Sequence, residues 1–118
     1  MKPRLDARAA EDAAASFLER QGYRIAQRNF ATRLGEIDIV AIDEGMVVFV
    51  EVKSRASVDY GPPEVAVDRR KRATLRRIAQ LFLERHGLLD TACRFDVVAL
   101  TPTPDGNDWD FELFQDAF

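Results

Sequence analysis

Residues able to form covalent or metal cross-links are scarce in this sequence. Among its 118 residues there is one cysteine, Cys93, and one histidine, His86. A single cysteine excludes a disulfide within the chain and a four-thiolate zinc site. A chain of this length can instead bury roughly two thirds of its unfolded surface around one core. We therefore expect residues 1–118 to form a single domain that needs no cross-link.

Long apolar runs are also missing. A transmembrane helix needs about 20 predominantly apolar residues, whereas Glu51, Lys53 and Arg55 interrupt the longest apolar run of the chain. The start of the sequence lacks the apolar stretch of a signal peptide. The sequence therefore predicts a cytoplasmic protein with no membrane segment.

The chain lacks the overall positive charge of a general nucleic-acid-binding protein, since its net charge is −3. Its cations are nevertheless concentrated, because six of the nine residues from Arg69 to Arg77 are Lys or Arg. Like charges three and four positions apart on a helix repel by roughly a few tenths of a kcal/mol per pair. Such a segment is typical of a surface that binds phosphate. The alternative is a solvated helix face balanced by acidic neighbours.

What the sequence does contain is two segments rich in β-branched residues, 35–42 and 46–53, joined by residues 43–45. This pattern predicts a β-hairpin. A two-residue loop pairs Asp43 with Met46. A three-residue loop with a bulge is the alternative.

Continuing the two-residue register places Asp38 opposite Glu51 and Glu36 opposite Lys53, so that these four charged side chains share one face. Both faces are otherwise apolar, which places the strands inside a sheet covered on both sides. The expected faces are Val40, Ile42, Val47 and Phe49 beside the charges, and Ile37, Ile39, Ala41, Val48, Val50 and Val52 on the other side. Three carboxylates and one lysine in such a place favour a bound divalent cation. A salt-bridge network is the alternative.

The other segments predict two helices and three further strands. In order, the expected elements are a helix over residues 6–21, a strand over 23–29, a loop over 30–34, the two hairpin strands, a loop over 54–63, a helix from about 63 to 87, and strands over 94–100 and 109–114. This order, αβββαββ, predicts an α/β protein in which a mixed central sheet lies between two helices as a three-layer α/β/α sandwich. The second helix then crosses over to a parallel strand.

Two charged residues lie on or beside the apolar stripes of the predicted helices. Glu11 lies on the margin of the first stripe, and Lys71 lies four residues before Leu75 on the second. Glu11 is therefore a candidate for the charged cluster, and a solvated glutamate is the alternative. Trp109 is interpreted as a core residue.

The spacing of the charged residues resembles a known active-site pattern. Asp38, followed thirteen residues later by Glu51-Val52-Lys53, is similar to the motif of the PD-(D/E)XK nuclease superfamily. Further stretches resemble the bacterial YraN family of uncharacterised proteins over nearly the whole chain. They are Glu11 with Phe17-Leu18, Asn29, Gly35 to Asp38, Val48 to Lys53, Gly61, Lys71, Arg94 to Ala99 and Asp116 to Phe118. The resemblance implies a restriction-endonuclease-like core similar to that of archaeal Holliday-junction resolvases.

The same resemblance implies the roles of individual residues. Asp38, Glu51 and Glu11 would bind Mg²⁺ or Mn²⁺, and Lys53 would be the catalytic lysine. Ile37 stands where the name of the superfamily has proline. The expected function is therefore that of a metal-dependent nuclease.

This nuclease is expected to hydrolyse phosphodiester bonds in DNA, structured or branched DNA included. Glu36 is assigned a catalytic role, either tuning Lys53 or serving as a further metal ligand. The expected nucleic-acid-binding residues are Arg55, Arg69, Arg70, Lys71, Arg72 and Arg76. The alternatives are a nucleic-acid-binding module with an inactive nuclease-like fold and a protein-interaction domain. A homodimer is left open.

Overall fold

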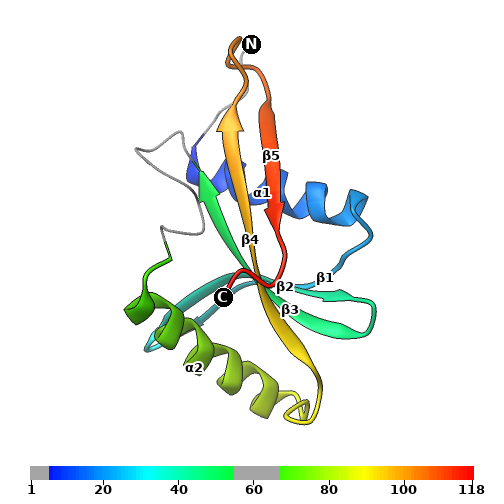
Figure 1. Ribbon diagram of the computed structural model, residues 1–118, viewed down its shortest axis with the longest axis vertical. Helices are drawn as coiled ribbons and strands as arrows, with labels where there is room; N and C mark the ends of the chain where they lie inside the picture. The colour runs from blue at the N-terminus through cyan, green and yellow to red at the C-terminus, as the bar shows by residue number, and fades with distance from the viewer. Residues whose placement is uncertain (1–5, 55–66) are drawn as a thin grey trace.

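The computed structural model describes residues 6–54 and 67–118, whose strands form one five-stranded sheet accompanied by two helices (Figure 1). The elements are α1 (Ala7–Arg20), β1 (Arg24–Thr32), β2 (Gly35–Asp43), β3 (Met46–Ser54), α2 (Arg69–Arg85), β4 (Cys93–Pro102) and β5 (Trp109–Phe114). The strands lie side by side in chain order, with β3 and β4 parallel and the other neighbours antiparallel. The predicted element order and the mixed α/β sheet are therefore confirmed.

Helix α1 forms where local chemistry predicts it. The side chain of Asp6 caps the first turn by accepting a hydrogen bond from the Ala9 amide at 2.9 Å. Gly22 follows the end of the helix with a φ angle of 97°, which suits glycine. The buried residues are Ala10, Ala14, Ala15 and Leu18. Because most of these side chains are small, the helix backbone can lie close to the sheet.

The hairpin of β2 and β3 closes through a two-residue turn. Glu44 and Gly45 both have positive φ angles, 52° and 79°, as a type I′ turn requires. Asp43 pairs with Met46, which confirms the two-residue loop. The alternative of a three-residue loop with a bulge at Gly45 is therefore wrong.

The regular alternation predicted for β2 is wrong at Asp38. Ile37 packs in the same core cluster as Val40, whereas Ile39 packs in the other cluster. Strict alternation would have placed Ile37 with Ile39. The side chains of β2 therefore change faces by one position at Asp38.

The neighbouring strand is irregular at the same point. Arg28 pairs with Ile39, and Phe30 pairs with Ile37. Between these pairs stands Asn29, whose φ angle of 55° is in the left-handed region. Such a residue interrupts the pleat of a strand. Both strands thus change faces together, and their register is kept.

Two predicted boundaries are also wrong. Strand β1 continues to Thr32 through residues expected to form a loop, because Phe30 is buried and remains paired with β2. Helix α2 begins at Arg69 and not near residue 63, because the side chain of Asp68 accepts a hydrogen bond from the Lys71 amide at 2.8 Å and caps the first turn. Residues 55–66, with most of the predicted 54–63 loop, lie outside the described residues.

Each helix packs into its own hydrophobic cluster. The first cluster joins α2 to the strands through Phe30, Ile37, Val40, Val47, Phe49, Val67, Leu75, Ile78, Ala79, Phe82, Leu83, Phe95 and Val97. The second joins α1 to the strands through Ala10, Ala14, Ala15, Leu18, Tyr23, Ile39, Ala41, Val48, Val50, Val98, Leu100 and Trp109. The core role predicted for Trp109 is confirmed. Neither helix of the described residues is long and apolar enough to cross a membrane.

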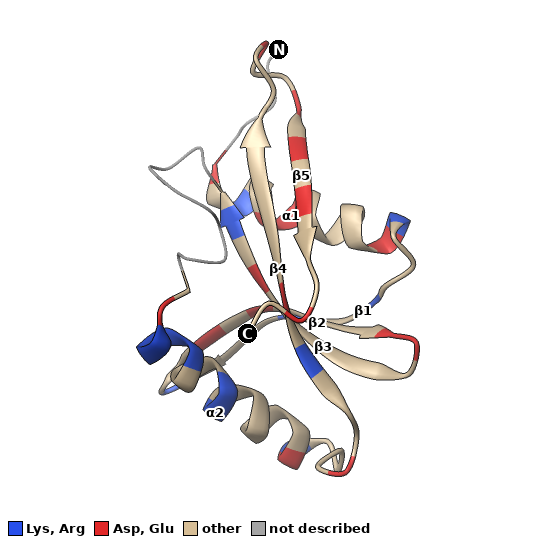
Figure 2. Cartoon of the chain, in the orientation of Figure 1, with Lys and Arg blue, Asp and Glu red and all other residues tan. Residues whose placement is uncertain are grey.

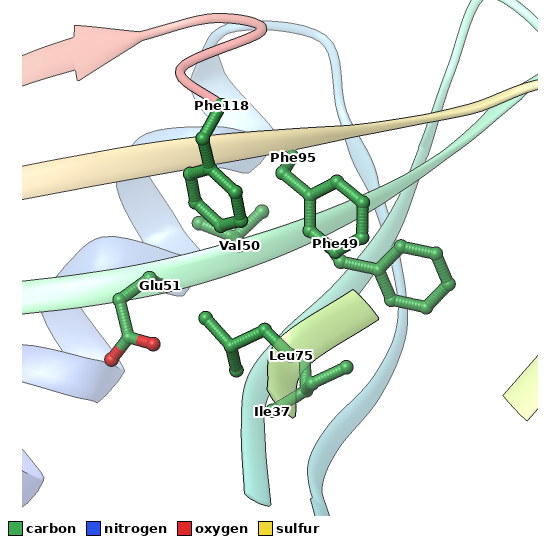
Figure 3. Close-up of a pocket in the computed structure, with 7 residues that line it drawn as sticks. All are labelled: Ile37, Phe49, Val50, Glu51, Leu75, Phe95 and Phe118. Carbon is green, nitrogen blue, oxygen red and sulfur yellow. The ribbon is translucent and has the colours of Figure 1, made fainter. Parts of the chain in front are cut away.

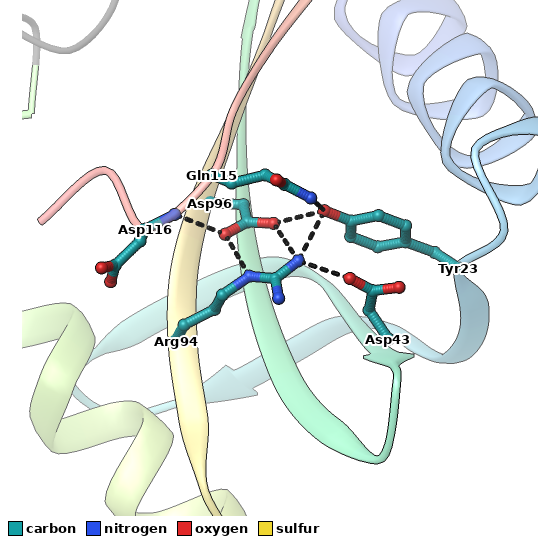
Figure 4. A network of polar contacts seen from close by, with 6 residues as sticks. All are labelled: Tyr23, Asp43, Arg94, Asp96, Gln115 and Asp116. Carbon is teal, nitrogen blue, oxygen red and sulfur yellow. Dashed lines mark hydrogen bonds and ion pairs between the residues drawn. The ribbon is translucent and has the colours of Figure 1, made fainter.

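A buried polar network joins residues from the first and last parts of the chain. The carboxylate of Asp96 is fully buried and accepts hydrogen bonds from the Tyr23 hydroxyl at 2.6 Å, Arg94 Nε at 3.0 Å and the Asp116 amide at 2.9 Å (Figure 4). Arg94 Nη2 also donates to Asp43 Oδ2 at 2.7 Å. Because the carboxylates of Asp96 and Asp43 each accept hydrogen bonds from Arg94, their burial needs no ligand.

Candidate functional site

Three carboxylates from two elements converge beside the kink in β2. Glu11 of α1 and Glu36 and Asp38 of β2 each offer an oxygen atom, and these atoms all lie within 4.8 Å of one another. The kink explains the meeting, because it leaves Asp38 and Glu36 on the side of the sheet that carries Glu11. The prediction that Glu11 joins the charged cluster is confirmed as a matter of position.

The side chain of Asp38 is hydrogen-bonded to the backbone of β3. The β2–β3 ladder reaches Ile39 and Val50 and ends there. Beyond that point the Val52 amide donates a hydrogen bond to Asp38 Oδ2 at 2.8 Å. The ladder pairs predicted for Asp38 with Glu51 and for Glu36 with Lys53 are therefore wrong, because the strands separate just before them.

Asp38 and Glu51 nevertheless remain electrostatic neighbours. The pKa of Asp38 is raised to about 8, first by burial and then by the charge of Glu51. The hydrogen bond from Val52 acts in the opposite direction. The pKa of Glu11 is also raised, first by burial and then by the charge of Glu36. The acids thus oppose one another's ionisation in the absence of a cation.

These acids line a cleft of about 340 Å³ between α1 and the end of β3. The lining residues are Ala7, Ala10, Glu11, Asp38, Glu51, Val52, Lys53 and Ser54. The predicted residues Asp38, Glu51 and Lys53 therefore share one cavity with Glu11. Glu36 does not line it, although its carboxylate oxygen lies beside those of Glu11 and Asp38.

A second, much smaller pocket lies beside Glu51 among apolar side chains. It measures about 10 Å³, and Figure 3 shows Glu51 at its edge, with Leu75 and Phe118 among the other lining side chains. A space of this size holds at most about one water molecule. This pocket is therefore a packing gap, and the polar cleft is the place where a ligand fits.

Helix α2 supplies a cation to the acids. Lys71 Nζ lies 3.3 Å from Glu51 Oε1, and the Glu51 side chain is 10% exposed against 42% for Lys71. Burial lowers the pKa of Lys71, but the charge of Glu51, together with the contact to Lys53 and the charge of Asp38, offsets this and the pKa is raised. The apolar-stripe position of Lys71 thus directs its ammonium group toward the sheet.

The other cations of α2 have different surroundings, although Figure 2 shows them together on the first turns of the helix. The guanidinium groups of Arg72 and Arg76 lie over the ring of Phe118, at 5.6 and 5.5 Å from its centroid. Arg70 instead lines a groove of about 350 Å³ with Lys71 and residues of the β1–β2 turn. Arg69 and Arg70 are exposed. Arg55 lies outside the described residues.

Sequence reasoning missed the contribution of β1. Arg28 Nη2 lies 2.7 Å from Asp12 Oδ1 and 3.9 Å from Glu11 Oε1. Asn29 lies beside Glu11 and Glu36. The spacing of apolar residues gave no signal, because a register shift between Ile25 and Gln27 and the left-handed Asn29 together leave Ile25 and Phe30 on opposite faces, as regular alternation would.

Comparison with known proteins identifies relatives that this chain matches over most of their length. Residues 10–100 match the model of the uncharacterised protein family UPF0102. A UPF0102 protein of Symbiobacterium thermophilum is 50% identical over 110 residues, which cover 93% of this chain and 92% of that protein. A UPF0102 protein of Moorella thermoacetica is 51% identical over 90 residues, which cover 76% and 75%. The resemblance to the YraN family is thereby confirmed, and the chain belongs to the family UPF0102.

Proposed function

We propose that this protein is a metal-dependent nuclease that hydrolyses phosphodiester bonds in DNA, structured or branched DNA included. The observation that carries the proposal is the meeting of Glu11, Glu36 and Asp38 within 4.8 Å of one another, beside Glu51 and Lys53. Arg28 approaches Glu11 at 3.9 Å but contacts Asp12 more closely, at 2.7 Å, which is a weaker compensation than Arg94 gives Asp96 at 3.0 Å.

The donor set suits a hard divalent cation. Carboxylate oxygens are the protein ligands that Mg²⁺ and Mn²⁺ prefer. Burial and Glu51 raise the pKa of Asp38 to about 8, and a cation would favour its charged form. Asp38, Glu51 and Glu11 would hold the ion, with Glu36 as a further ligand. When bound, Mg²⁺ supplies a water of lowered pKa and offsets the charge that develops on the phosphate.

The chain's own residues would orient the reacting groups. Lys53 lines the same cleft as Asp38 and Glu51, where its side-chain amine can orient the attacking water or help to deprotonate it. Lys71 and Arg70 lie at the start of α2, beside a groove that adjoins Glu36. These two cations would hold the phosphate backbone.

The fold supports the superfamily resemblance. Glu36, Asp38 and Glu51 lie on a β-hairpin at the centre of a mixed sheet, with β3 parallel to β4. The two helices pack in separate clusters, which suits the three-layer restriction-endonuclease-like core.

One observation favours a second candidate, a nucleic-acid-binding module with an inactive site. Glu51 has an ion-pair partner in Lys71 without any metal, so the buried acid does not by itself require a cation. The two candidates differ in cleavage and agree in DNA binding.

The test is cleavage of end-labelled DNA, supplied as a linear duplex and as a four-way junction, with Mg²⁺, with Mn²⁺ or with a chelator. The nuclease is expected to cut only with metal, and Asp38→Asn and Glu51→Gln should abolish cutting while DNA still binds. Binding that weakens steeply with salt but is never followed by metal-dependent cleavage would leave the inactive module. Equal cleavage by the two variants and the wild type would also overturn the nuclease.

A further inference from the structure

Asn29 has a backbone conformation that is unusual within a strand. Three described non-glycine residues have φ angles in the left-handed region: Asn29 at 55°, Glu44 at 52° and Asp116 at 52°. Glu44 lies in a turn and Asp116 beyond the last strand, whereas Asn29 lies inside β1. Such conformations persist where the surrounding structure holds them, and asparagine tolerates them better than most residues.

The kink decides which helix Asn29 faces. Gln27 pairs with Val40, which belongs to the cluster on the α2 side. Regular alternation would direct residue 29 to that same side. Arg28 faces α1, since its guanidinium group contacts Asp12, and the side chain of Asn29 also faces α1. Two consecutive residues of β1 therefore present donors to α1.

The side chain of Asn29 joins two of the acids. The amide orientation follows from its neighbours: with its nitrogen toward the acids, Nδ2 lies 2.9 Å from Glu11 Oε1 and 3.1 Å from Glu36 Oε1. The opposite orientation would set an oxygen against two carboxylate oxygens. An asparagine amide carries two hydrogens, so it can donate one to the carboxylate from α1 and one to the carboxylate from β2.

We infer that Asn29 is a positioning residue, which holds the carboxylates of Glu11 and Glu36 side by side for a divalent cation. The inference rests on the proposed function. An amide reduces the repulsion between the two acids by donating hydrogen bonds, yet it adds no positive charge. A lysine or arginine in the same place would neutralise an acid and compete with the cation. The kink in β1 thus places a neutral donor where a charged one would hinder metal binding.

The variant Asn29→Gly distinguishes the contribution of the Asn29 side chain from that of its backbone conformation. Glycine adopts a φ angle of 55° without strain and carries no amide. The expected result is a Mn²⁺ Kd at least about 10-fold weaker than that of the wild type, because groups that orient ligating side chains typically change metal affinity by about 10- to 100-fold. The melting temperature of the metal-free variant should stay close to that of the wild type. Isothermal titration calorimetry and thermal melts measure the two quantities.

Two matched variants control for the backbone. Glu44→Gly makes the same kind of change at a positive φ angle in the β2–β3 turn and should leave the Mn²⁺ Kd unchanged. Asn29→Ala removes the amide but keeps the strained backbone, so it should weaken Mn²⁺ binding as much as Asn29→Gly and also melt at a lower temperature.

Each outcome bears on the inference. A wild-type Kd in Asn29→Gly would overturn it and leave the proposed function standing. If the Mn²⁺ affinity of the two Asn29 variants fell only in proportion to their melting temperatures, Asn29 would have a role in folding alone. That result would also overturn the inference. Absence of Mn²⁺ binding by the wild-type protein would overturn both proposals together.

Discussion

At the scale of single residues, Asp38 is held where its charge is disfavoured. Its carboxylate is largely buried, lies beside Glu51 and receives one backbone hydrogen bond, from Val52. Asp96 is more deeply buried, yet it is surrounded by donors that include the guanidinium group of Arg94. The contrast shows that this chain can pair a buried acid fully, and that it does not do so at Asp38.

The raised pKa of Asp38 predicts how stability depends on pH. Its pKa is about 8 in the folded protein and about 3.9 in an unfolded chain, so between these values the folded state binds a proton that the unfolded state releases. The contribution of protonated Asp38 to the stability of the fold is therefore complete below about pH 4 and is lost as the pH rises through about 8. The melting temperature of the metal-free protein should therefore fall between pH 5 and pH 8, and less so in Asp38→Asn.

At pH 8 the Asp38→Asn variant should melt at or above the wild-type temperature, because a repulsion with Glu51 is relieved. It should also gain no stability from Mn²⁺. A variant that melts well below the wild type at pH 8, with an unchanged slope against pH, would show that Asp38 is part of a stabilising salt-bridge network instead.

Lys71 is expected to act as a substitute for the cation in the metal-free protein. Lys71→Met leaves the buried Glu51 carboxylate without its partner at 3.3 Å, which should lower the free energy of unfolding by about 1 kcal/mol or more. Mn²⁺ should bind more tightly to this variant, because a competing positive charge is gone.

Urea denaturation and calorimetric titration check these two effects of Lys71→Met. Arg69→Met is the matched control, since it removes an exposed cation from the same turn of α2. If Lys71→Met and Arg69→Met gave equal stability and equal Mn²⁺ affinity, the ion pair of Lys71 with Glu51 would have no role at the site.

At the scale of elements, four arginines in the first half of α2 divide into two sets. Arg69 and Arg70 are exposed at its first turn, and Arg70 lines the groove beside the acids. Arg72 and Arg76 lie over aromatic rings. A cluster that is uniform in sequence therefore has two physical roles, because a helix turns by about 100° per residue and presents its neighbours to different surroundings.

Paired substitutions separate these roles. Arg69→Ser with Arg70→Ser should weaken DNA binding and reduce the slope of log K against log salt by about one unit per lost phosphate contact, with little change in stability. Arg72→Ser with Arg76→Ser should lower stability, by about 0.5–1 kcal/mol for each lost cation–π contact, with a smaller effect on the salt slope. Filter binding at several salt concentrations and thermal melts measure both, and the reverse ranking would contradict the division.

At the scale of the whole molecule, the Asp96 network ties distant parts of the chain together. Asp96 and Arg94 of β4 contact Tyr23 before β1, Asp43 at the end of β2 and Asp116 after β5 (Figure 4). The hydrogen bonds that Arg94 donates to Asp96 and Asp43 raise its pKa against the effect of burial. These contacts join the first strands to the last segment, and they lie outside the cleft lined by Asp38 and Glu51.

Removing the centre of this network should therefore affect folding and spare the site. Asp96→Ala leaves the guanidinium group of Arg94 without its main partner, which should destabilise the protein by about 3–5 kcal/mol. Protein that remains folded should bind Mn²⁺ with the wild-type Kd. Denaturation curves and titration of the folded variant test this, and a selective loss of Mn²⁺ affinity would connect the network to the cleft.

Much of this architecture is determined by short-range sequence patterns. The β2–β3 turn, the cap of α1 at Asp6 and the order of the elements follow from propensities and periods that act over a few residues. The same patterns placed Asp38, Glu51 and Lys53 near one another, because two strands joined by a two-residue turn bring paired positions together wherever the chain goes afterwards. The cap of α2 at Asp68 is equally local, because its side chain accepts a hydrogen bond from the Lys71 amide three residues later.

Other features were decided only by the tertiary structure. The kink that turns Asp38 toward Glu11 requires Asn29 of one strand to stand opposite Asp38 of the next, and neither residue by itself predicts it. The approach of Lys71 to Glu51 depends on how α2 lies across the sheet. Such contacts join residues that are distant in the chain, and their geometry is set by the packing of two hydrophobic clusters at once. The sequence therefore determines which charged groups the hairpin carries, and the packing of both helices determines which of them meet.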